Sequence, residues 1–328
     1  MAQPQIKEVM KISAFTFIRN AEKFYYPIKE SILSVLPIVD EFIIALGKSD
    51  QDDDTLSIIK SIDSDKILLL ETDWDTDRFP QGSVYAQQTD LARSKCTGDW
   101  LIYIQGDEVL HEQDLQQILS ACGDHLNNDE VEGLVLNYVH FWGDYNHTAK
   151  GHAWYDCEVR IIKSLPQIHS WRDAQSFRFH FDSFEQEYFK IKNTRSLKCI
   201  LLNARVFHYG WVRPPHIIKT KNDEVRKNYK SNLWKEFDQN FDFGRMDYYV
   251  EYTGTHPQVM ASRIKKMNWA HLLRYSGPLV LNRSKLKHEK WKYRILTVVE
   301  TILFRGRKIG GFRNFTIVKT RSTIVIQK

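Results

Sequence analysis

The sequence predicts an α/β protein in which helices cover both faces of a mainly parallel sheet. Short apolar runs recur along the first 140 residues, and segments with helical spacing of apolar residues lie between them. Parallel neighbours need crossover connections, and helices supply them. The hydrophobic and charged fractions, 42% and 27%, are those of an ordinary globular protein.

The predicted strands and helices alternate in the order that a crossover fold requires. The apolar, β-prone runs predict strands at residues 11–18, 42–46, 66–70, 100–104 and 133–139. Helical spacing predicts helices that begin near Pro27, lie around residues 56–59, and span residues 84–95 and 115–126. Pro27 suits the first turn of a helix, since its nitrogen has no hydrogen to leave unbonded.

The second half of the chain has a different character. Beyond about residue 140 the pattern becomes irregular and aromatic, and after Pro214-Pro215 it becomes basic. We therefore predict a nucleotide-binding and catalytic domain at residues 1–215 and a basic, mostly helical extension at residues 216–328. Residues 261–328 hold 17 Lys and Arg but two acids, a net charge of +15, while the whole chain carries +5.

The basic segment restricts the classes of partner. It is expected to attract anionic lipid or nucleic acid, with a solvated basic face as the alternative interpretation. The start of the chain lacks the pattern of an export signal, and no uncharged apolar run of about 18 residues occurs. The four cysteines form no CxxC pair. We expect a cytoplasmic protein, with peripheral contact to the inner face of the membrane.

The most informative motif is an apolar strand that ends in two adjacent carboxylates, Asp107 and Glu108. The carboxyl ends of parallel strands form the edge where open α/β folds bind ligands. A carboxylate there suits Mg²⁺ or Mn²⁺ bridging a diphosphate. The alternative interpretation is that both acids cap the next helix.

Four segments in the same order give the chain a resemblance to bacterial family 2 glycosyltransferases with the GT-A fold, over roughly residues 10–215. They are FTFIRNAEKF at 15–24, the Ser-Ile-Leu-Ser helix at 31–34, DEFIIALGKSDQDDDT at 40–55 and ARSKCTGDWLIYIQGDE at 92–108. The resemblance implies a GT-A fold and a nucleotide-sugar donor. It also implies that Phe17, Asn20, Arg93 and Gln105 contact that donor. Lys219 and Lys221 follow shortly after Pro214-Pro215 and are candidates to contact the diphosphate, and the alternative interpretation is that both are surface lysines.

The sequence departs from the family pattern at two places. Gln105 stands where the family's Asp-x-Asp begins, so direct metal ligation falls to Asp107. Ala45-Leu46-Gly47 stands where the family has an acid for the nucleotide base, so the base is undetermined. His208 lies in a later β-like run, where the family often has a histidine that completes the metal or diphosphate site. An imidazole ligand favours Mn²⁺ over Mg²⁺.

Transfer of a sugar also requires a base for the acceptor hydroxyl. By resemblance, the acceptor segment corresponds to residues 170–175, and we predict Asp173 as the general base with Arg172 as its ion-pair partner. The alternative interpretation is an ordinary surface pair.

Taken together, these motifs predict a metal-dependent, inverting glycosyltransferase that acts on a glycan or lipid-linked acceptor, as in the assembly of cell envelope polysaccharide. The competing functions are a metal-dependent nucleotidyltransferase and a non-catalytic nucleic-acid-binding protein. The first is disfavoured because no Gly-rich phosphate loop precedes a Lys. We expect no nucleic-acid partner.

Overall fold

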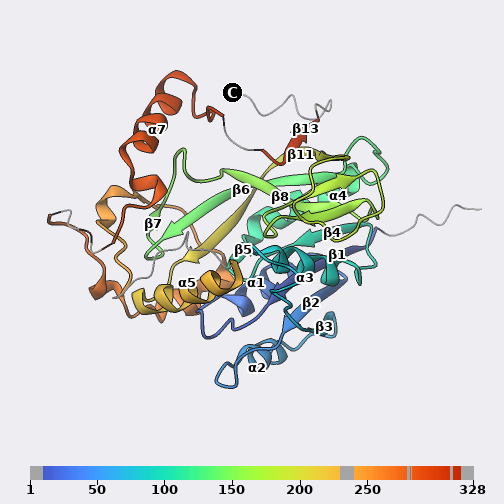
Figure 1. Ribbon diagram of the computed structural model, residues 1–328, viewed down its shortest axis with the longest axis horizontal. Coiled ribbons are helices and arrows are strands. Elements are labelled where there is room, and N and C mark those ends of the chain that lie inside the picture. The colour runs from blue at the N-terminus through green and yellow to red at the C-terminus, as the bar shows by residue number, and fades with distance from the viewer. Residues whose placement is uncertain (1–9, 230–239, 279–280, 282, 311–312, 319–328) are drawn as a thin grey trace, which may run out of the picture.

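The computed structural model describes residues 10–229, 240–278, 281, 283–310 and 313–318 (Figure 1). The strands are β1 Ile12–Ile18, β2 Glu41–Gly47, β3 Ile67–Thr72, β4 Trp100–Tyr103, β5 Glu108–Leu110, β6 Gly133–Trp142, β7 His147–Thr148, β8 Cys157–Lys163, β9 Ile168–Trp171, β10 Ser176–His180, β11 Thr194–Trp211, β12 Val250–Glu251 and β13 Phe315–Ile317. The helices are α1 Ile28–Val35, α2 Thr55–Lys60, α3 Ser83–Arg93, α4 Leu115–Asp124, α5 Pro215–Tyr229, α6 Ala261–Lys265 and α7 Trp291–Leu303. Short 3-10 turns lie at Leu36–Ile38, Glu112–Asp114, Met246–Tyr248, Gln258–Met260, Ala270–Leu272 and Lys287–Glu289.

The N-terminal strands form a parallel sheet in the order β3-β2-β1-β4. Successive side chains of β1 point to opposite faces, and both faces are buried, as in other sheets that helices cover on both sides. On one face Ile32 of α1 and Ile118 of α4 belong to the same buried cluster as Ala14. On the other face Ala92 of α3 packs in the cluster that contains Phe15. The predicted fold class, an α/β fold with helices on both faces of a parallel sheet, is confirmed for the N-terminal half of the sheet.

Beyond β4 the sheet becomes mixed and continues in the order β8-β6-β11-β10-β9. β8 runs antiparallel to both β4 and β6, while β11 runs parallel to β6. The sequence indicated only a short run at residues 205–211, but β11 begins at Thr194. The exposed polar residues Lys198 and Asn203 interrupt its apolar pattern, which hides the strand in the sequence.

The C-terminal segment packs against this mixed half of the sheet. Its described residues include the α-helices α5, α6 and α7, and aromatic side chains such as Phe243 and Trp269 are buried in one cluster with Trp142 and Tyr209. The last described strand, β13, pairs with β11 and so rejoins the sheet. Within the described residues, none of the helices has the length and apolar character needed to cross a bilayer.

His288 is a polar group in this aromatic packing. Its ring lies 4.8 Å from that of Trp142, and its Nε2 lies 2.9 Å from Tyr249 Oη. Burial lowers the pKa of His288, Glu289 opposes the shift and Arg283 adds to it, so that the pKa is about 4. The folded protein therefore holds a neutral imidazole at pH values where an unfolded chain would protonate it.

This difference predicts a loss of stability in acid. Between pH 6.5 and about 4 the unfolded state binds a proton at His288 that the folded state does not, so the free energy of unfolding falls as the pH falls. The loss is up to about 3 kcal/mol at the acid end. Urea unfolding across this pH interval measures it, with His288→Gln and, as a control at an exposed position, His216→Gln. If the free energy of unfolding fell equally with pH in the wild type and in His288→Gln, the prediction would be contradicted.

Candidate functional site

The ends of β1 and β2 are tied together by Asn20. Asn20 has a left-handed backbone with φ of 53°, a conformation that asparagine tolerates better than most residues. Its Oδ1 accepts a hydrogen bond from the Asp50 backbone N–H at 2.8 Å, and its own N–H donates to Ser49 Oγ at 3.0 Å. These contacts fix the loop after β2 against the carboxyl end of β1, at the sheet edge where the sequence predicted the donor.

The turn after β4 carries Gln105 and Asp107. A Cβ on Gly106 would lie 2.7 Å from Ile18 Cδ1, so a larger residue here would require the end of the Ile18 side chain to move. The side-chain amide of Gln105 donates to the Ala174 carbonyl at 3.2 Å and lies 3.1 Å from Tyr103 Oη. Gln105 therefore supports the loop that carries Asp173. An ionised acid in its place has no hydrogen to donate to a carbonyl and would not make this contact.

Asp107 lies at the centre of a group of cations. Its side chain is buried, and Oδ2 is 3.9 Å from His208 Nε2 and 3.8 Å from Lys221 Nζ. Burial raises the pKa of Asp107, but the charges of His208, Lys221 and Arg213 outweigh it and hold the pKa below its usual range. Burial lowers the pKa of His208, against the opposing effect of Asp107. Asp107 therefore stays ionised.

The chemistry of this pair fits a divalent cation that is shared with a diphosphate. Oxygen and nitrogen atoms 3.9 Å apart can both reach one ion through bonds of about 2.1 Å. A Cβ on Gly210 would lie 2.6 Å from His208 Nε2 and 2.9 Å from Asp107 Oδ2, so the glycine keeps the approach open. In the part of the chain that the structure describes, no group of three or more His, Cys, Asp or Glu side chains is placed to hold a metal. A cation at Asp107 would therefore need ligands from substrate and water, as Mg²⁺ commonly does.

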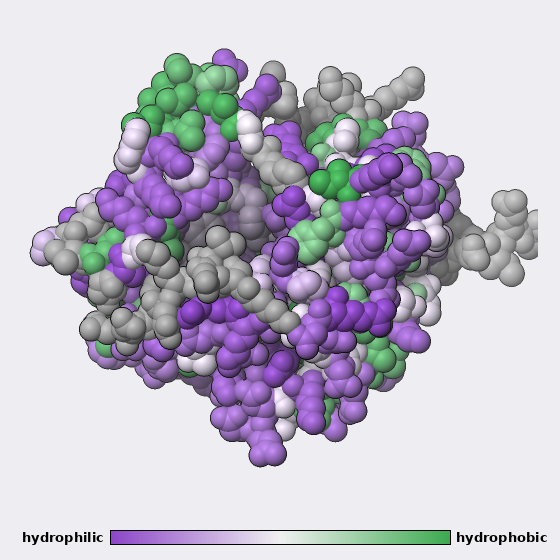
Figure 2. All heavy atoms as spheres, viewed as in Figure 1, coloured by the Kyte–Doolittle hydropathy of each residue, from purple (hydrophilic) through white to green (hydrophobic). Residues whose placement is uncertain are grey.

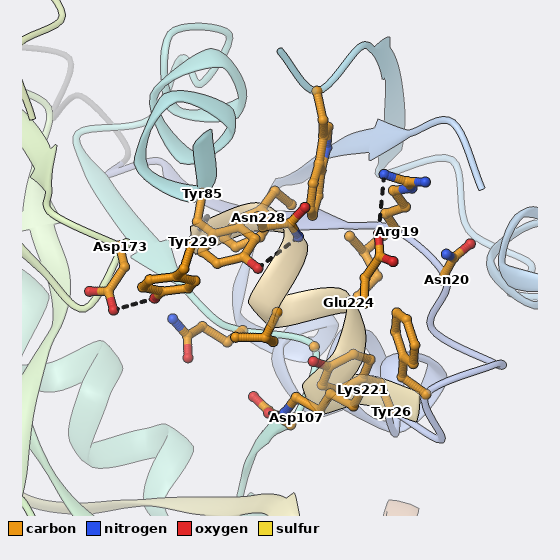
Figure 3. Close-up of a pocket in the computed structure, with 17 residues that line it drawn as sticks. Arg19, Asn20, Tyr26, Tyr85, Asp107, Asp173, Lys221, Glu224, Asn228 and Tyr229 are labelled. Carbon is orange, nitrogen blue, oxygen red and sulfur yellow. Dashed lines mark hydrogen bonds and ion pairs between the residues drawn. The ribbon is translucent and has the colours of Figure 1, made fainter. Parts of the chain in front are cut away.

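Asp173 lies on the β9–β10 loop, between two left-handed residues. Arg172 and Ala174 have φ values of 56° and 64°. Asp173 Oδ2 accepts a hydrogen bond of 2.7 Å from Tyr229 Oη of α5 (Figure 3). Burial and the neighbouring carboxylate raise the pKa of Tyr229, so it remains a donor. The Arg172 guanidinium lies 4.3 Å above the ring of Trp171.

Asp107 and Asp173 line the same cavity, which has a volume of about 280 Å³. Residues of β1, of the turn after β4 and of α5 surround it, as Figure 3 shows. The lining is Phe17, Ile18, Arg19, Asn20, Phe24, Tyr26, Trp74, Tyr85, Gln105, Gly106, Asp107, Asp173, Lys221, Glu224, Val225, Asn228 and Tyr229.

One wall of the cavity is aromatic. Phe17 stacks on Tyr85 with ring centroids 5.6 Å apart, and Trp74 lies 5.9 Å from Phe17. Tyr229 continues the wall at 6.1 Å from Tyr85. Such a wall can stack a nucleobase or the apolar face of a sugar. The cavity thus combines an aromatic wall with ionised and cationic side chains.

The structure brings most of the sequence-predicted site residues together. Phe17, Asn20, Gln105, Asp107 and Asp173 line the cavity, and His208 adjoins Asp107. Two others point elsewhere and are not among the lining residues: Arg93 bonds to Asp90 and lies 3.1 Å from His169 Nδ1, while Lys219 pairs with Asp223.

Of the two lysines considered from the sequence, Lys221 and not Lys219 lines the cavity. It follows the buried Ile218 by three positions and so lies on the same face of α5, toward the cavity. Lys219 lies on another face. The helical spacing between Lys221 and the buried Ile218 is therefore the feature of the sequence that distinguishes Lys221 from Lys219. Burial and the nearby Arg213 lower the pKa of Lys221 to about 7, although Asp107 opposes the shift.

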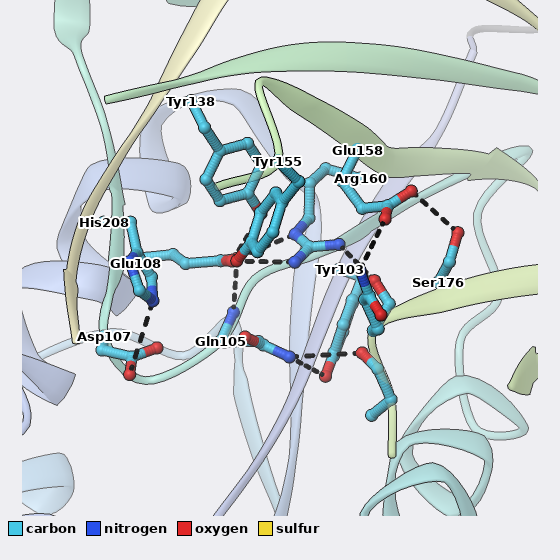
Figure 4. A network of polar contacts seen from close by, with 12 residues as sticks. Tyr103, Gln105, Asp107, Glu108, Tyr138, Tyr155, Glu158, Arg160, Ser176 and His208 are labelled. Atoms are coloured by element: carbon cyan, nitrogen blue, oxygen red, sulfur yellow. Dashed lines mark hydrogen bonds and ion pairs between the residues drawn. The ribbon is translucent and has the colours of Figure 1, made fainter. Parts of the chain in front are cut away.

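A buried ion pair lies behind the cavity and joins the strands that carry it (Figure 4). Arg160 of β8 donates two hydrogen bonds to Glu108, of 2.9 and 2.8 Å. Glu108 also accepts from Tyr138 Oη of β6 and from the Gln105 backbone N–H. Arg160 in turn donates to the Gln175 carbonyl in the Asp173 loop. The pair thus connects both carboxylate-bearing segments.

Comparison with known proteins finds no matching family model and no matching curated relative. Among solved structures, the chain is similar to S. aureus TarS 1–349, with 15% identity and a TM-score of 0.37, over 67% of this chain and 65% of TarS 1–349. It is also similar to glucosyl-3-phosphoglycerate synthase from Mycobacterium tuberculosis in complex with Mn²⁺, UDP and phosphoglyceric acid. There the identity is 17% and the TM-score 0.29, over 40% of this chain and 44% of the synthase. The chain thus spans just under two thirds of TarS 1–349.

The buried pair predicts a large effect on stability. Arg160→Met would leave the Glu108 carboxylate buried without its cation and is expected to lower the free energy of unfolding by about 3–5 kcal/mol. Urea unfolding measures this loss. Lys190→Met is the control, because it breaks the solvent-exposed pair with Glu187 and should cost about 1 kcal/mol or less. Equal losses of unfolding free energy in the two variants would show that the Arg160–Glu108 pair stabilises the fold no more than the Lys190–Glu187 pair does.

Proposed function

We propose that this protein is a glycosyltransferase that moves a sugar from a nucleotide-diphosphate donor to a hydroxyl group of a saccharide or lipid-linked acceptor. The observation that carries the proposal is the cavity in which the ionised Asp107, with His208 and Lys221 beside it, and the carboxylate of Asp173 face the same space. The aromatic wall at Phe17 suits the nucleoside or sugar of such a donor.

In the proposed reaction, Asp173 takes the proton of the acceptor hydroxyl as its oxygen attacks the anomeric carbon. The bond from that carbon to the diphosphate oxygen breaks, and a single displacement inverts the configuration. Tyr229 holds the Asp173 carboxylate by its hydrogen bond, and Lys221 lies where it can balance the charge of the leaving diphosphate. Asp107 and His208 would hold Mn²⁺ or Mg²⁺, which when bound supplies Lewis-acid neutralisation of that diphosphate.

The proposal also assigns parts of the chain. Residues 1–215 bind the donor and hold both carboxylates, and residues 216–328 form an extension whose first helix, α5, closes one side of the cavity. We place the protein in the cytoplasm, where nucleotide sugars are made, with an envelope glycan as the acceptor class. The donor contacts are proposed for Phe17, Asn20 and Gln105, which line the cavity.

The first test is donor binding. Calorimetry with a panel of uridine, guanosine and thymidine diphosphate sugars is expected to find one donor that binds with Mn²⁺ and more weakly without it. Asp107→Asn keeps the shape of the side chain but removes its charge, and should weaken metal-dependent binding by about tenfold or more. Asp65→Asn, at an exposed position outside the cavity, is the control and should bind as the wild type does. Absence of binding by the wild type to every donor would overturn the proposal.

The second test concerns the proposed base. Slow hydrolysis of the donor uses water as the acceptor, and release of the nucleoside diphosphate measures its rate. Asp173→Asn is expected to lower kcat by about 100- to 10,000-fold with little change in donor affinity. Tyr229→Phe removes only the hydrogen bond to Asp173 and should lower kcat far less. If Tyr229→Phe reproduced the whole loss, Asp173 would act by holding α5 rather than as a base.

A further inference from the structure

Helix α7 turns its polar side toward the protein. Thr297 Oγ1 accepts a hydrogen bond of 3.0 Å from the His152 backbone N–H, and Glu300 Oε1 lies 2.6 Å from His152 Nδ1. A Cβ on Gly151 would lie 2.5 Å from Thr297 Oγ1, so the helix packs closely on this loop. Glu300 is the one buried residue of α7. The helix is therefore held through polar contacts rather than through an apolar face.

The opposite face of α7 is an apolar stripe in contact with solvent. It consists of Trp291, Ile295, Val298 and Ile302, which are 74%, 54%, 55% and 70% exposed. Their spacing of four, three and four residues places them on one side of the helix. Leu303, next to Ile302 at the end of the helix, is 71% exposed. Figure 2 shows a hydrophobic area over the upper end of α7.

This arrangement is the reverse of an ordinary surface helix, which buries its apolar stripe and exposes its polar residues. Single exposed apolar residues need no explanation, but a contiguous patch indicates a binding surface. α7 also lies at the periphery of the molecule, apart from the parallel strands (Figure 1). The stripe thus faces outward from the protein, where an extended partner surface can reach it.

The charges around the stripe are positive. Basic residues flank it along the helix and follow its end: Lys290, Lys292, Arg294, Arg305 and Arg307. The two acids of the region are both engaged within the protein. Glu289 pairs with Arg283, and Glu300 accepts from the Ile309 backbone N–H besides its contact with His152. The segment therefore presents cations and apolar side chains together.

We propose that α7 binds the surface of an anionic lipid bilayer, with the stripe of Trp291, Ile295, Val298 and Ile302 in the acyl boundary and the flanking Lys and Arg residues on lipid phosphates. An apolar face bordered by basic residues is the pattern of helices that lie in the plane of the interface. Each Lys or Arg near an anionic surface adds attraction, and salt weakens it. This inference does not depend on the proposed sugar transfer.

Vesicle sedimentation tests the proposal with the full chain. The wild type is expected to sediment with phosphatidylcholine vesicles that contain phosphatidylglycerol, and to sediment far less with phosphatidylcholine alone. Ile295→Ser combined with Ile302→Ser should weaken binding to the anionic vesicles by about tenfold or more. Phe181→Ser combined with Ile191→Ser is the matched control, because these side chains are 63% and 60% exposed but lie outside α7.

A second readout locates the contact on the helix. Vesicles of brominated lipid quench a tryptophan that enters the acyl region, so the wild type should lose fluorescence on binding. Trp291→Phe keeps an apolar side chain and should bind as the wild type does while losing most of this quenching. Lys292→Gln combined with Arg294→Gln should weaken binding and make it less sensitive to salt.

The outcomes separate the membrane from other partners of the stripe. Failure of the wild type to bind anionic vesicles would overturn the proposal, as would equal binding by the α7 and control variants. If the serine substitutions instead converted a dimer to a monomer in light scattering, the stripe would be a contact between two copies of the chain. The same variants should bind the sugar-nucleotide donor as the wild type does in calorimetry, so failure of the membrane proposal and failure of the proposed function can be told apart.

Discussion

The buried ion pair between Arg160 and Glu108 is the constraint on which the site depends. It lies where the parallel half of the sheet meets the mixed half, and its hydrogen bonds reach the turn after β4, strand β6 and the Asp173 loop. Two charges removed from water are stable only when every remaining donor and acceptor is engaged. Because those partners come from separate segments, the segments must adopt one arrangement, and Asp107 is held beside the cavity as a consequence.

Gln105 connects two segments of the site through its neutral side chain. Its amide donates to the Ala174 carbonyl, so it joins the turn that carries Asp107 to the loop that carries Asp173. Its backbone N–H donates to Glu108 Oε2, so the same residue also contacts the buried ion pair. An ionised acid at this position has no hydrogen to donate to the Ala174 carbonyl and would not make this connection.

The elements that were predicted correctly are those marked by local periodicity of apolar residues. Strands β1 to β4 are continuous apolar runs, so their positions and the place of Asp107 at a strand end followed directly. The long β11 did not, because exposed residues such as Lys198 break its pattern and its partners lie far along the chain. Tyr229 was missed for a related reason, because its place beside the cavity depends on the approach of its ring to Gly82, which is distant in the sequence. Lys221 was considered with Lys219, and the helical spacing from the buried Ile218 separates the two.

The loop between β7 and β8 connects the outer helix with the centre of the molecule. His152 holds α7, and three residues later the Tyr155 carbonyl lies 2.7 Å from His140 Nε2. His140 Nδ1 in turn lies 3.1 Å from His208 Nδ1, next to Asp107. Burial holds the pKa of His140 well below its usual range, so the imidazole of His140 stays neutral in this chain of contacts. The surface proposed to bind at α7 is thus connected through this loop to the residues around Asp107, an arrangement that suits the proposed transfer to a lipid-linked acceptor.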